Sequence, residues 1–324
     1  LIFGFIFTFF SSFGQSFFLG LFNAPIRNEL DISHGQFGSI YASATICSSL
    51  LLVWVGKKID EYKLLNYSLF VVILLSISSL FFSFISNIYL LAVGIFLMRF
   101  SGQGLMSHTS TTAISRFFEK SRGKALSTIW FGLSTAEFIL PVLATYLFIT
   151  YSWRSIWQGI SIMILILLPL VIIKTIKTIK LDSREGKSLD FKNARIKNWK
   201  RKDVIHDFKF YIVSLNMLAG PWIITGIFVY QSFITEAKSW GMYAIPKAFM
   251  VYSITSILSL ILAGFLVDKF TSRKLIPIIN IPLLISMLTL FTVQNDYGAY
   301  IFLGLIGVSN GLANVLGSST WAEI

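Results

Sequence analysis

Two ionisable side chains, Arg99 and Glu137, lie about halfway along long apolar segments of the chain. A charge at the centre of a bilayer-spanning helix costs about 2.5–3.5 kcal/mol on insertion scales, so neither side chain is expected to face lipid. Arg99 could form a bidentate pair with a carboxylate, supplied either by Glu137 or by an anionic ligand. Glu137 could take up a proton when a neighbouring charge leaves. The alternative is a structural ion pair that holds two helices together.

Further polar side chains interrupt the apolar segments. Gln103 lies one helical turn from Arg99 on the same face, and Asn310 and Asn314 are spaced in the same way in another segment. Gln15 and Gln231 are single polar residues toward the ends of theirs. Each of these side chains is a candidate to contact a substrate, and an interhelical hydrogen bond is an equal alternative for each taken alone.

The elements that carry these residues are predicted to be membrane-spanning helices. The chain is 55% hydrophobic and only 13% charged, with a mean hydropathy of +0.74, whereas soluble domains carry about 25% charged residues. A helix needs about 20 mainly apolar residues to cross the hydrocarbon core. The interiors are too uniformly apolar for barrel strands, which alternate at every second residue. Ten segments qualify: 1–22, 36–56, 64–84, 88–112, 124–149, 155–176, 208–235, 243–266, 274–294 and 298–320.

The loops between these segments predict the orientation. With residue 1 in the cytoplasm, 22 of the 27 Lys and Arg residues fall on the cytoplasmic side and four on the outer side. Positive charge is retained on the cytoplasmic side during insertion. The net charge of +12 is therefore explained by topology, and no nucleic-acid partner is expected. The first apolar run has no small-residue cleavage site after it, so we expect it to remain as a helix.

The sequence offers little for metal, disulfide or ATP chemistry. Cys47 is the single cysteine, and His34, His108 and His206 are too scattered to suggest a metal site. A phosphate-binding loop needs a glycine five residues before its Gly-Lys-Ser, but Leu181 precedes Gly186 at that spacing. We expect no cofactor and no bound metal. A membrane-embedded enzyme would need clustered acidic residues at one membrane face, and the acidic residues here are single and spread over the loops.

A repeated pattern divides the chain into two parts. Gly56 and Asp60 follow the second segment, and Gly264 and Asp268 follow the eighth, each pair spaced Gly-x-x-x-Asp and followed two residues later by an aromatic residue. Transporter folds are often built from such duplicated halves. The hydrophilic stretch 177–207 separates six predicted helices from four. We therefore expect a six-helix half at 1–176, a basic cytoplasmic linker at 177–207, and at 208–324 a second half that ends about two helices early.

The repeated loop resembles the hallmark loop of the major facilitator superfamily. Arg99-x-x-Gly102-x-Gly104, Arg122-Gly123-Lys-Ala125 and Trp153-Arg154 also fit the superfamily. The segments that resemble a bacterial branch of it are Phe13-Gly14-Gln15-Ser16-Phe17-Phe18, Ser33-His34-Gly35-Gln36-Phe37-Gly38 and Trp321-Ala-Glu323. The first loop departs from the family pattern at Glu61 and Lys63, where a basic residue and a glycine are usual. The resemblance implies an all-α membrane protein with the superfamily's two six-helix halves, of which ten of the twelve helices are present in this sequence.

The resemblance also implies roles for individual residues. In the superfamily the first, fourth, seventh and tenth helices surround the cavity, so Arg99, Gln103, Gln15, Gln231, Asn310 and Asn314 could line it. Glu137 joins Arg99 as a candidate for proton coupling. The loop carboxylate of Asp60 would cap the start of the eleventh helix and latch the halves together, and Gly56 and Gly264 would let helices approach closely. The predicted gating residues are Gly56, Asp60, Gly264, Asp268 and Arg122.

Together these features predict a secondary transporter that works by alternating access. The leading hypothesis is a proton-coupled porter of a small organic anion in a bacterial inner membrane, with a cytoplasmic N-terminus and acting as a monomer in the lipid bilayer. A neutral or cationic solute that binds Glu137 is the alternative within this class. A membrane-embedded enzyme and a transport-dead sensor on the same fold are the alternatives from other classes.

Overall fold

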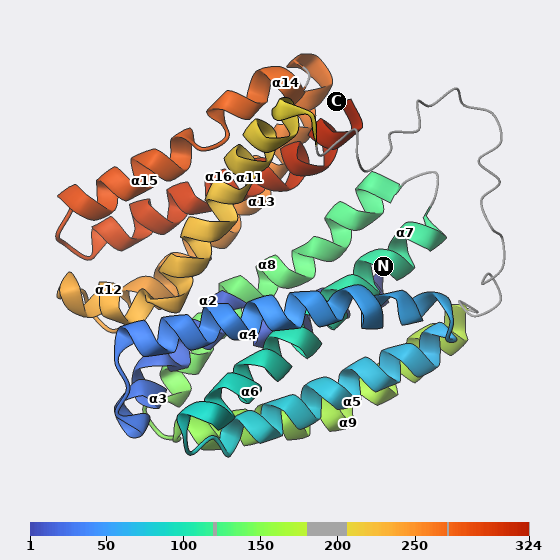
Figure 1. Cartoon of the computed structure of the whole chain (residues 1–324), viewed down its shortest axis with the longest axis vertical. Helices are drawn as coiled ribbons and strands as arrows, with labels where there is room; N and C mark the ends of the chain where they lie inside the picture. Colours follow the sequence, from blue (N-terminus) through green and yellow to red (C-terminus); the bar gives the residue numbers. More distant parts are fainter. Residues whose placement is uncertain (119–121, 180–205, 271, 324) are drawn as a thin grey trace. The chain divides into compact units, whose positions relative to one another are not determined.

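The computed structural model describes residues 1–118, 122–179, 206–270 and 272–323, and these residues fold mainly into helices (Figure 1). The first predicted span is a series of short helical pieces. They are α1 (Ile2–Ser11), η1 (Ser12–Gly14), α2 (Ser16–Leu19), η2 (Gly20–Phe22) and α3 (Asn23–Leu30). The span thus reaches Leu30, and the prediction that it ends at residue 22 was too short.

The next five spans follow as long helices. The second and third are α4 (His34–Val55), which continues into the 3₁₀ turn η3 (Gly56–Asp60), and α5 (Leu64–Ser83). The fourth is α6 (Ile88–Met98), the π-helical segment η4 (Arg99–Met106) and α7 (Ser107–Phe117). The fifth and sixth are α8 (Arg122–Leu147) and α9 (Trp153–Ile179). The fourth span therefore continues five residues beyond its predicted end.

The remaining helices complete the described part of the chain. They are α11 (Phe208–Val229), α12 (Gln231–Ala237), α13 (Ala244–Phe270), α14 (Ser272–Leu275), η7 (Ile276–Ile278), α15 (Ile281–Thr292) and α16 (Tyr297–Glu323). The predicted span 208–235 is wrong as a single helix, because α11 ends at Val229 and the short α12 begins at Gln231.

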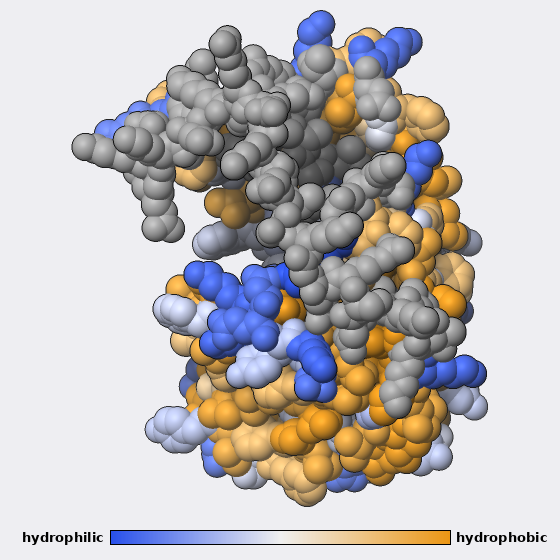
Figure 2. Space-filling view, turned by 90° about the vertical axis from the view of Figure 1, so that its right-hand side faces the viewer, coloured by the Kyte–Doolittle hydropathy of each residue, from blue (hydrophilic) through white to orange (hydrophobic). Residues whose placement is uncertain are grey.

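All ten predicted spans fall on helices. Eight described helices are long and apolar enough to cross a membrane, and Ile276–Thr292 is a shorter apolar one. Large apolar side chains are exposed along them, including Trp222, Phe265 and Phe291. Figure 2 shows hydrophobic side chains over much of the visible surface that is not grey. In water such a surface would be unfavourable, but it matches a lipid environment.

The ends of two helices follow from local sequence. Ser33 accepts a hydrogen bond from the Gln36 backbone N–H at the start of α4, and the Gln36 side chain accepts one from the Ser33 backbone. Asn87 caps α6 by accepting from the N–H groups of Tyr89 and Leu90. Such caps satisfy otherwise orphaned backbone donors and contribute about 1 kcal/mol each.

The helices pack through small and hydroxyl-bearing residues. α5 and α9 lie side by side (Figure 1), where Ser76 and Ser161 each donate to the other's backbone carbonyl at 3.0 and 2.8 Å. α15 and α16 pack in the same way, with Ser286 donating to the Phe302 carbonyl at 2.9 Å. Apolar side chains gain little by leaving lipid for a protein interface, so close packing and such hydrogen bonds hold the helices together.

The chain forms two compact units. One comprises residues 1–185 with 227–250, and the other residues 186–226 with 251–324. The boundary thus falls within α11 and within α13. The predicted linker 177–207 lies mostly outside the described residues, and the division into halves at that linker stays a prediction.

Candidate functional site

The first span breaks where it meets the fourth. After η1 the backbone of Gln15 is extended, with φ −81° and ψ 153°, and the helix restarts at Ser16. A Cβ on Gly102 would lie 2.6 Å from the Gly14 nitrogen, and one on Gly14 would collide with the Met98 carbonyl oxygen. Two glycines therefore bring the break directly against η4. Broken helices leave backbone groups free inside the membrane, and transporters use them at binding sites.

Arg99 fills the position beside this break. Its side chain is only 4% exposed, and Nη1 donates to the Gly14 carbonyl at 3.0 Å and to the Ser16 hydroxyl at 3.2 Å. The guanidinium carbon lies 5.3 Å from the centroid of the Tyr41 ring, and the Tyr41 hydroxyl donates to Ser16 at 2.9 Å. A cation is stabilised at a helix C-terminus, and Gly14 is the last residue of η1, which directly continues α1.

Among the described residues, the Arg99 guanidinium is hydrogen-bonded through one of its nitrogens. The hydrogen bonds described for this side chain all leave from Nη1, and Nε is buried without a partner. An arginine carries five N–H donors and cannot be deprotonated in a protein. A buried donor without an acceptor costs about 1–3 kcal/mol, more for a charged group. The site therefore holds a positive charge whose hydrogen-bonding capacity the described residues do not exhaust.

The other predicted site residues fall at several places. Gln15 and Gln103 flank the contact between the break and η4, and both are partly buried. Glu137 is 5% exposed in α8. The described contacts of Arg99 are with Gly14, Ser16 and Tyr41, so its pairing with Glu137 stays a prediction.

Three predicted residues lie outside this cluster. Gln231 donates to the Phe17 carbonyl at 2.8 Å, so it makes the interhelical hydrogen bond that was its alternative role. In the other unit, Asn310 donates to Ser256 at 3.1 Å, and Asn314 is exposed. Their contact with a substrate stays a prediction.

The loop after α4 is tied to α7. Asp60 forms an ion pair with Arg116, and His108 Nε2 lies 3.0 Å from the Gly56 carbonyl oxygen. A Cβ on Gly56 would lie 3.2 Å from that imidazole nitrogen, which fits the expected close approach. Sequence reasoning assigned Asp60 to the eleventh helix and missed Arg116, although Arg116 is on the same predicted cytoplasmic side.

The second copy of this loop behaves differently. A Cβ on Gly264 would meet no described atom within 4 Å, and the close approach expected there stays a prediction. The side chains of Asp268 and Arg122, which were also predicted to act in gating, lie outside the described residues. The latch between Asp60 and an eleventh helix stays a prediction.

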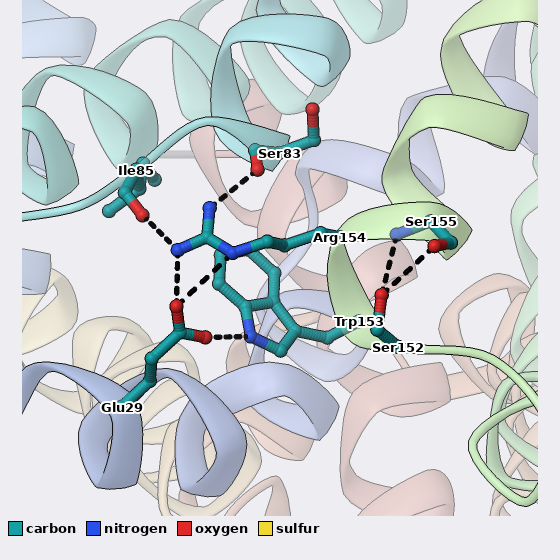
Figure 3. Close-up of polar contacts among 7 residues, drawn as sticks. All are labelled: Glu29, Ser83, Ile85, Ser152, Trp153, Arg154 and Ser155. Atoms are coloured by element: carbon teal, nitrogen blue, oxygen red, sulfur yellow. Dashed lines mark hydrogen bonds and ion pairs between the residues drawn. The ribbon is translucent and has the colours of Figure 1, made fainter.

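At the predicted outer end, Glu29 joins two neighbouring residues of α9 (Figure 3). Its carboxylate accepts from Trp153 Nε1 at 2.7 Å and from Arg154 Nε at 3.2 Å. Arg154 also donates to the carbonyls of Ser83 and Ile85, each at 2.6 Å, and lies over the Trp153 ring. This outer cluster ties α3 and α9 to the end of α5. Sequence reasoning singled out Trp153-Arg154 but missed Glu29.

A second set of outer contacts joins residues 227–250 to the first span. Asn23, which is fully buried, donates to the Val229 carbonyl at 2.6 Å. Tyr230 donates to the His34 carbonyl at 3.1 Å, and Phe17 packs against Phe249 with ring centroids 5.7 Å apart. We call these, with the bond from Gln231 to Phe17, the outer contact. They explain why the start of α13 belongs to the unit of the N-terminal helices.

Comparison with known proteins identifies the family. Residues 4–323 match the sequence profile of the Major Facilitator Superfamily. The chain belongs to the Major Facilitator Superfamily. Membership in this superfamily makes it a secondary transporter rather than an enzyme, and the prediction drawn from the repeated loop is confirmed. A search of curated proteins finds no match.

Solved structures of the superfamily share the fold. A bacterial homologue of the human lysosomal transporter Spinster, inward-facing and occupied, has a TM-score of 0.67 at 14% identity, covering 96% of this chain and 72% of its own. The nucleoside transporter NupG has a TM-score of 0.66 at 12% identity, covering 99% of this chain and 82% of its own. At such identities the likeness extends to the fold alone.

Proposed function

We propose that this transporter carries a small organic anion, which it binds through Arg99. The observation that carries the proposal is the buried Nε of Arg99, which has no acceptor in the part of the chain that the structure describes. A carboxylate would accept from Nε and from the second terminal nitrogen as a bidentate pair, which is the strongest geometry available to arginine. Nη1 is already committed to Gly14 and Ser16, so the guanidinium is oriented before the ligand arrives.

The position of Arg99 supports a role in the transport cycle. Its bonds to Gly14 and Ser16 link η4 to both sides of the break in the first span. A carboxylate on the other edge of the guanidinium would neutralise the charge that now stabilises the break. Substrate binding would then change the strength of this link, which is what a site that drives rocking of two halves requires.

Glu137 is our candidate for proton coupling. It lies in α8, which packs against α1, the helix that leads to the break. A buried carboxylate is costly in its charged form unless it is paired. Arrival or loss of a charge near Glu137 would therefore change its protonation and couple the substrate to a proton gradient.

The remaining features of the proposal come from sequence. The excess of Lys and Arg on one side supports a cytoplasmic N-terminus, and the resemblance to a bacterial branch supports an inner-membrane location, with the protein acting as a monomer. In this proposal the outer contact and the ion pair between Asp60 and Arg116 would have to rearrange as access alternates.

A ligand screen with purified full-length protein in detergent tests the substrate class. The melting temperature is measured with small carboxylates, amines and neutral solutes for wild type, Arg99→Lys and the control Arg116→Lys. Arg99→Lys keeps the positive charge, but a lysine has a single nitrogen and cannot donate to a carboxylate from two nitrogens at once. We expect carboxylates alone to stabilise the wild type and the control, and the shift to be lost in Arg99→Lys.

Two results would contradict the anion proposal. If carboxylates stabilise Arg99→Lys as much as wild type, the Arg99 edge does not bind them. If only amines or neutral solutes stabilise the protein and Glu137→Gln abolishes that effect, the alternative substrate class is supported. The buried Glu137 carboxylate is the observation that favours this alternative.

A further inference from the structure

A cavity of about 450 Å³ lies beside the outer contact. It is bounded by the end of α8, by α12 and by the start of α13, and its lining includes Phe148, Gln231, Ser232, Glu236 and Trp240. Known small-molecule sites range from about 300 to 1,000 Å³, so the volume is sufficient for a ligand. None of the three residues that contact Arg99 lines this cavity.

Gln231, one of the residues that line this cavity, carries a buried amide oxygen that has no hydrogen-bond donor among the described residues. Its side chain is 3% exposed, and its Nε2 donates to two carbonyl oxygens, those of Phe17 at 2.8 Å and Phe228 at 2.9 Å. Two carbonyl acceptors require the NH₂ group on that side, which fixes the orientation of the amide. The amide oxygen Oε1 is therefore left buried, with no donor supplied by any described residue.

Two further side chains that line the cavity, Ser232 and Glu236, can accept hydrogen bonds. The hydroxyl of Ser232 is buried without a hydrogen-bond partner among the described residues, and the carboxylate of Glu236 is exposed one turn further along α12. Glu236 is the one charged residue among those that line the cavity. The rest of the lining is largely apolar and includes the side chains of Phe148 and the buried Trp240. A ligand that fits must bring N–H donors, a positive charge and an apolar body.

We propose that this cavity is a binding site for an organic ammonium ion with an apolar body. The ammonium group donates to Gln231 Oε1, to Ser232 and to Glu236, and the apolar body lies against Phe148 and Trp240. A ligand there stabilises the position of α12 against α8. Because Gln231 is also bonded to the backbone of α2, binding favours the outer contact and slows the step in which that contact must open.

Three probes of nearly equal size test the site by isothermal titration of the full-length protein. Phenethylammonium, 2-phenylethanol and 3-phenylpropionate differ mainly in charge. The variants are Glu236→Gln and Ser232→Ala, and Asp31→Asn is the matched control because it removes an exposed carboxylate from the same predicted outer face. We expect phenethylammonium to bind far more tightly than the other two probes. Affinity should fall about tenfold or more in Glu236→Gln and remain unchanged in Asp31→Asn.

Each other outcome overturns the proposal. Equal binding of the three probes means apolar partition, and no binding of phenethylammonium means that the cavity is not a site for this class. Binding that survives Glu236→Gln but is lost in Glu137→Gln means that the amine binds at Glu137 and not in this cavity. The melting temperature of each variant without ligand checks that the variant is folded. Because Glu236 is exposed, we expect Glu236→Gln to have the same melting temperature as wild type.

Discussion

Arg99 donates a hydrogen bond to the Gly14 carbonyl oxygen at 3.0 Å, across 85 residues of sequence. The carbonyl is free because the first span breaks after Gly14, and the break is possible because Gly14 and Gly102 let two backbones meet. The charge, the break and the close contact therefore depend on one another. Changing any of the three should disturb the other two.

The close contact gives the first prediction. Gly14→Ala should lower the stability of the protein by about 1–3 kcal/mol, since the new methyl group would meet backbone atoms that cannot move aside. Gly159→Ala is the control, because a Cβ there meets no described atom within 4 Å and alanine favours a helix interior. The measurement is the melting temperature of the full-length protein in detergent. A fall for Gly159→Ala equal to that for Gly14→Ala would show that close packing is not what Gly14 provides.

The helices could be predicted from sequence because the lipid bilayer constrains the composition and length of each spanning segment by itself. A spanning helix must be long and apolar, so the ten segments are visible without any tertiary information. The cap at Ser33 and Gln36 is similarly local. The break at Gln15 could not be predicted, because its position depends on Gly102, which lies in another helix.

The partners of the charged residues were also beyond sequence reasoning. Arg99 binds a backbone carbonyl, and every residue type has one, so no pattern marks Gly14 as its acceptor. Glu29 and Arg154 are 125 residues apart, and only the fold brings them together. The predicted topology places both on the outer side, which was the one signal available for this pair.

The outer cluster gives the second prediction. Glu29→Gln should destabilise the protein by about 1 kcal/mol, because Trp153 and Arg154 lose a charged acceptor, while the ion pair of Arg154 and Glu29 is partly exposed to water and therefore weak. Glu61→Gln is the control, since the exposed pair of Lys58 and Glu61 should contribute less. A double-mutant cycle of Glu29→Gln with Arg154→Lys, read by melting temperature, measures the coupling. Additive effects would mean that the ion pair contributes nothing measurable.

The ion pair between Asp60 and Arg116 gives the third prediction. Both side chains are substantially exposed, so Asp60→Asn should change stability by less than about 1 kcal/mol. If Asp60 also acts as a latch, Asp60→Asn should reduce transport in proteoliposomes more than Arg116→Gln does. The comparison uses uptake of the ligand found in the melting screen, with Glu61→Gln as a control. An equal loss of transport in the two variants would mean that the ion pair with Arg116 accounts for the whole effect. The proposed latch role of Asp60 would then be wrong.

The outer contact gives the fourth prediction. Asn23 is fully buried, and its amide bond to the Val229 carbonyl links α3 to the end of α11. Asn23→Leu removes that donor and leaves a buried carbonyl without its partner, which costs about 1–3 kcal/mol and weakens the contact. A reporter thiol at Leu21→Cys, in a Cys47→Ser background, should therefore react faster with a water-soluble maleimide. Thr128→Val, which removes an exposed hydroxyl elsewhere, is the control. An unchanged labelling rate in Asn23→Leu would show that this hydrogen bond does not hold the outer contact closed.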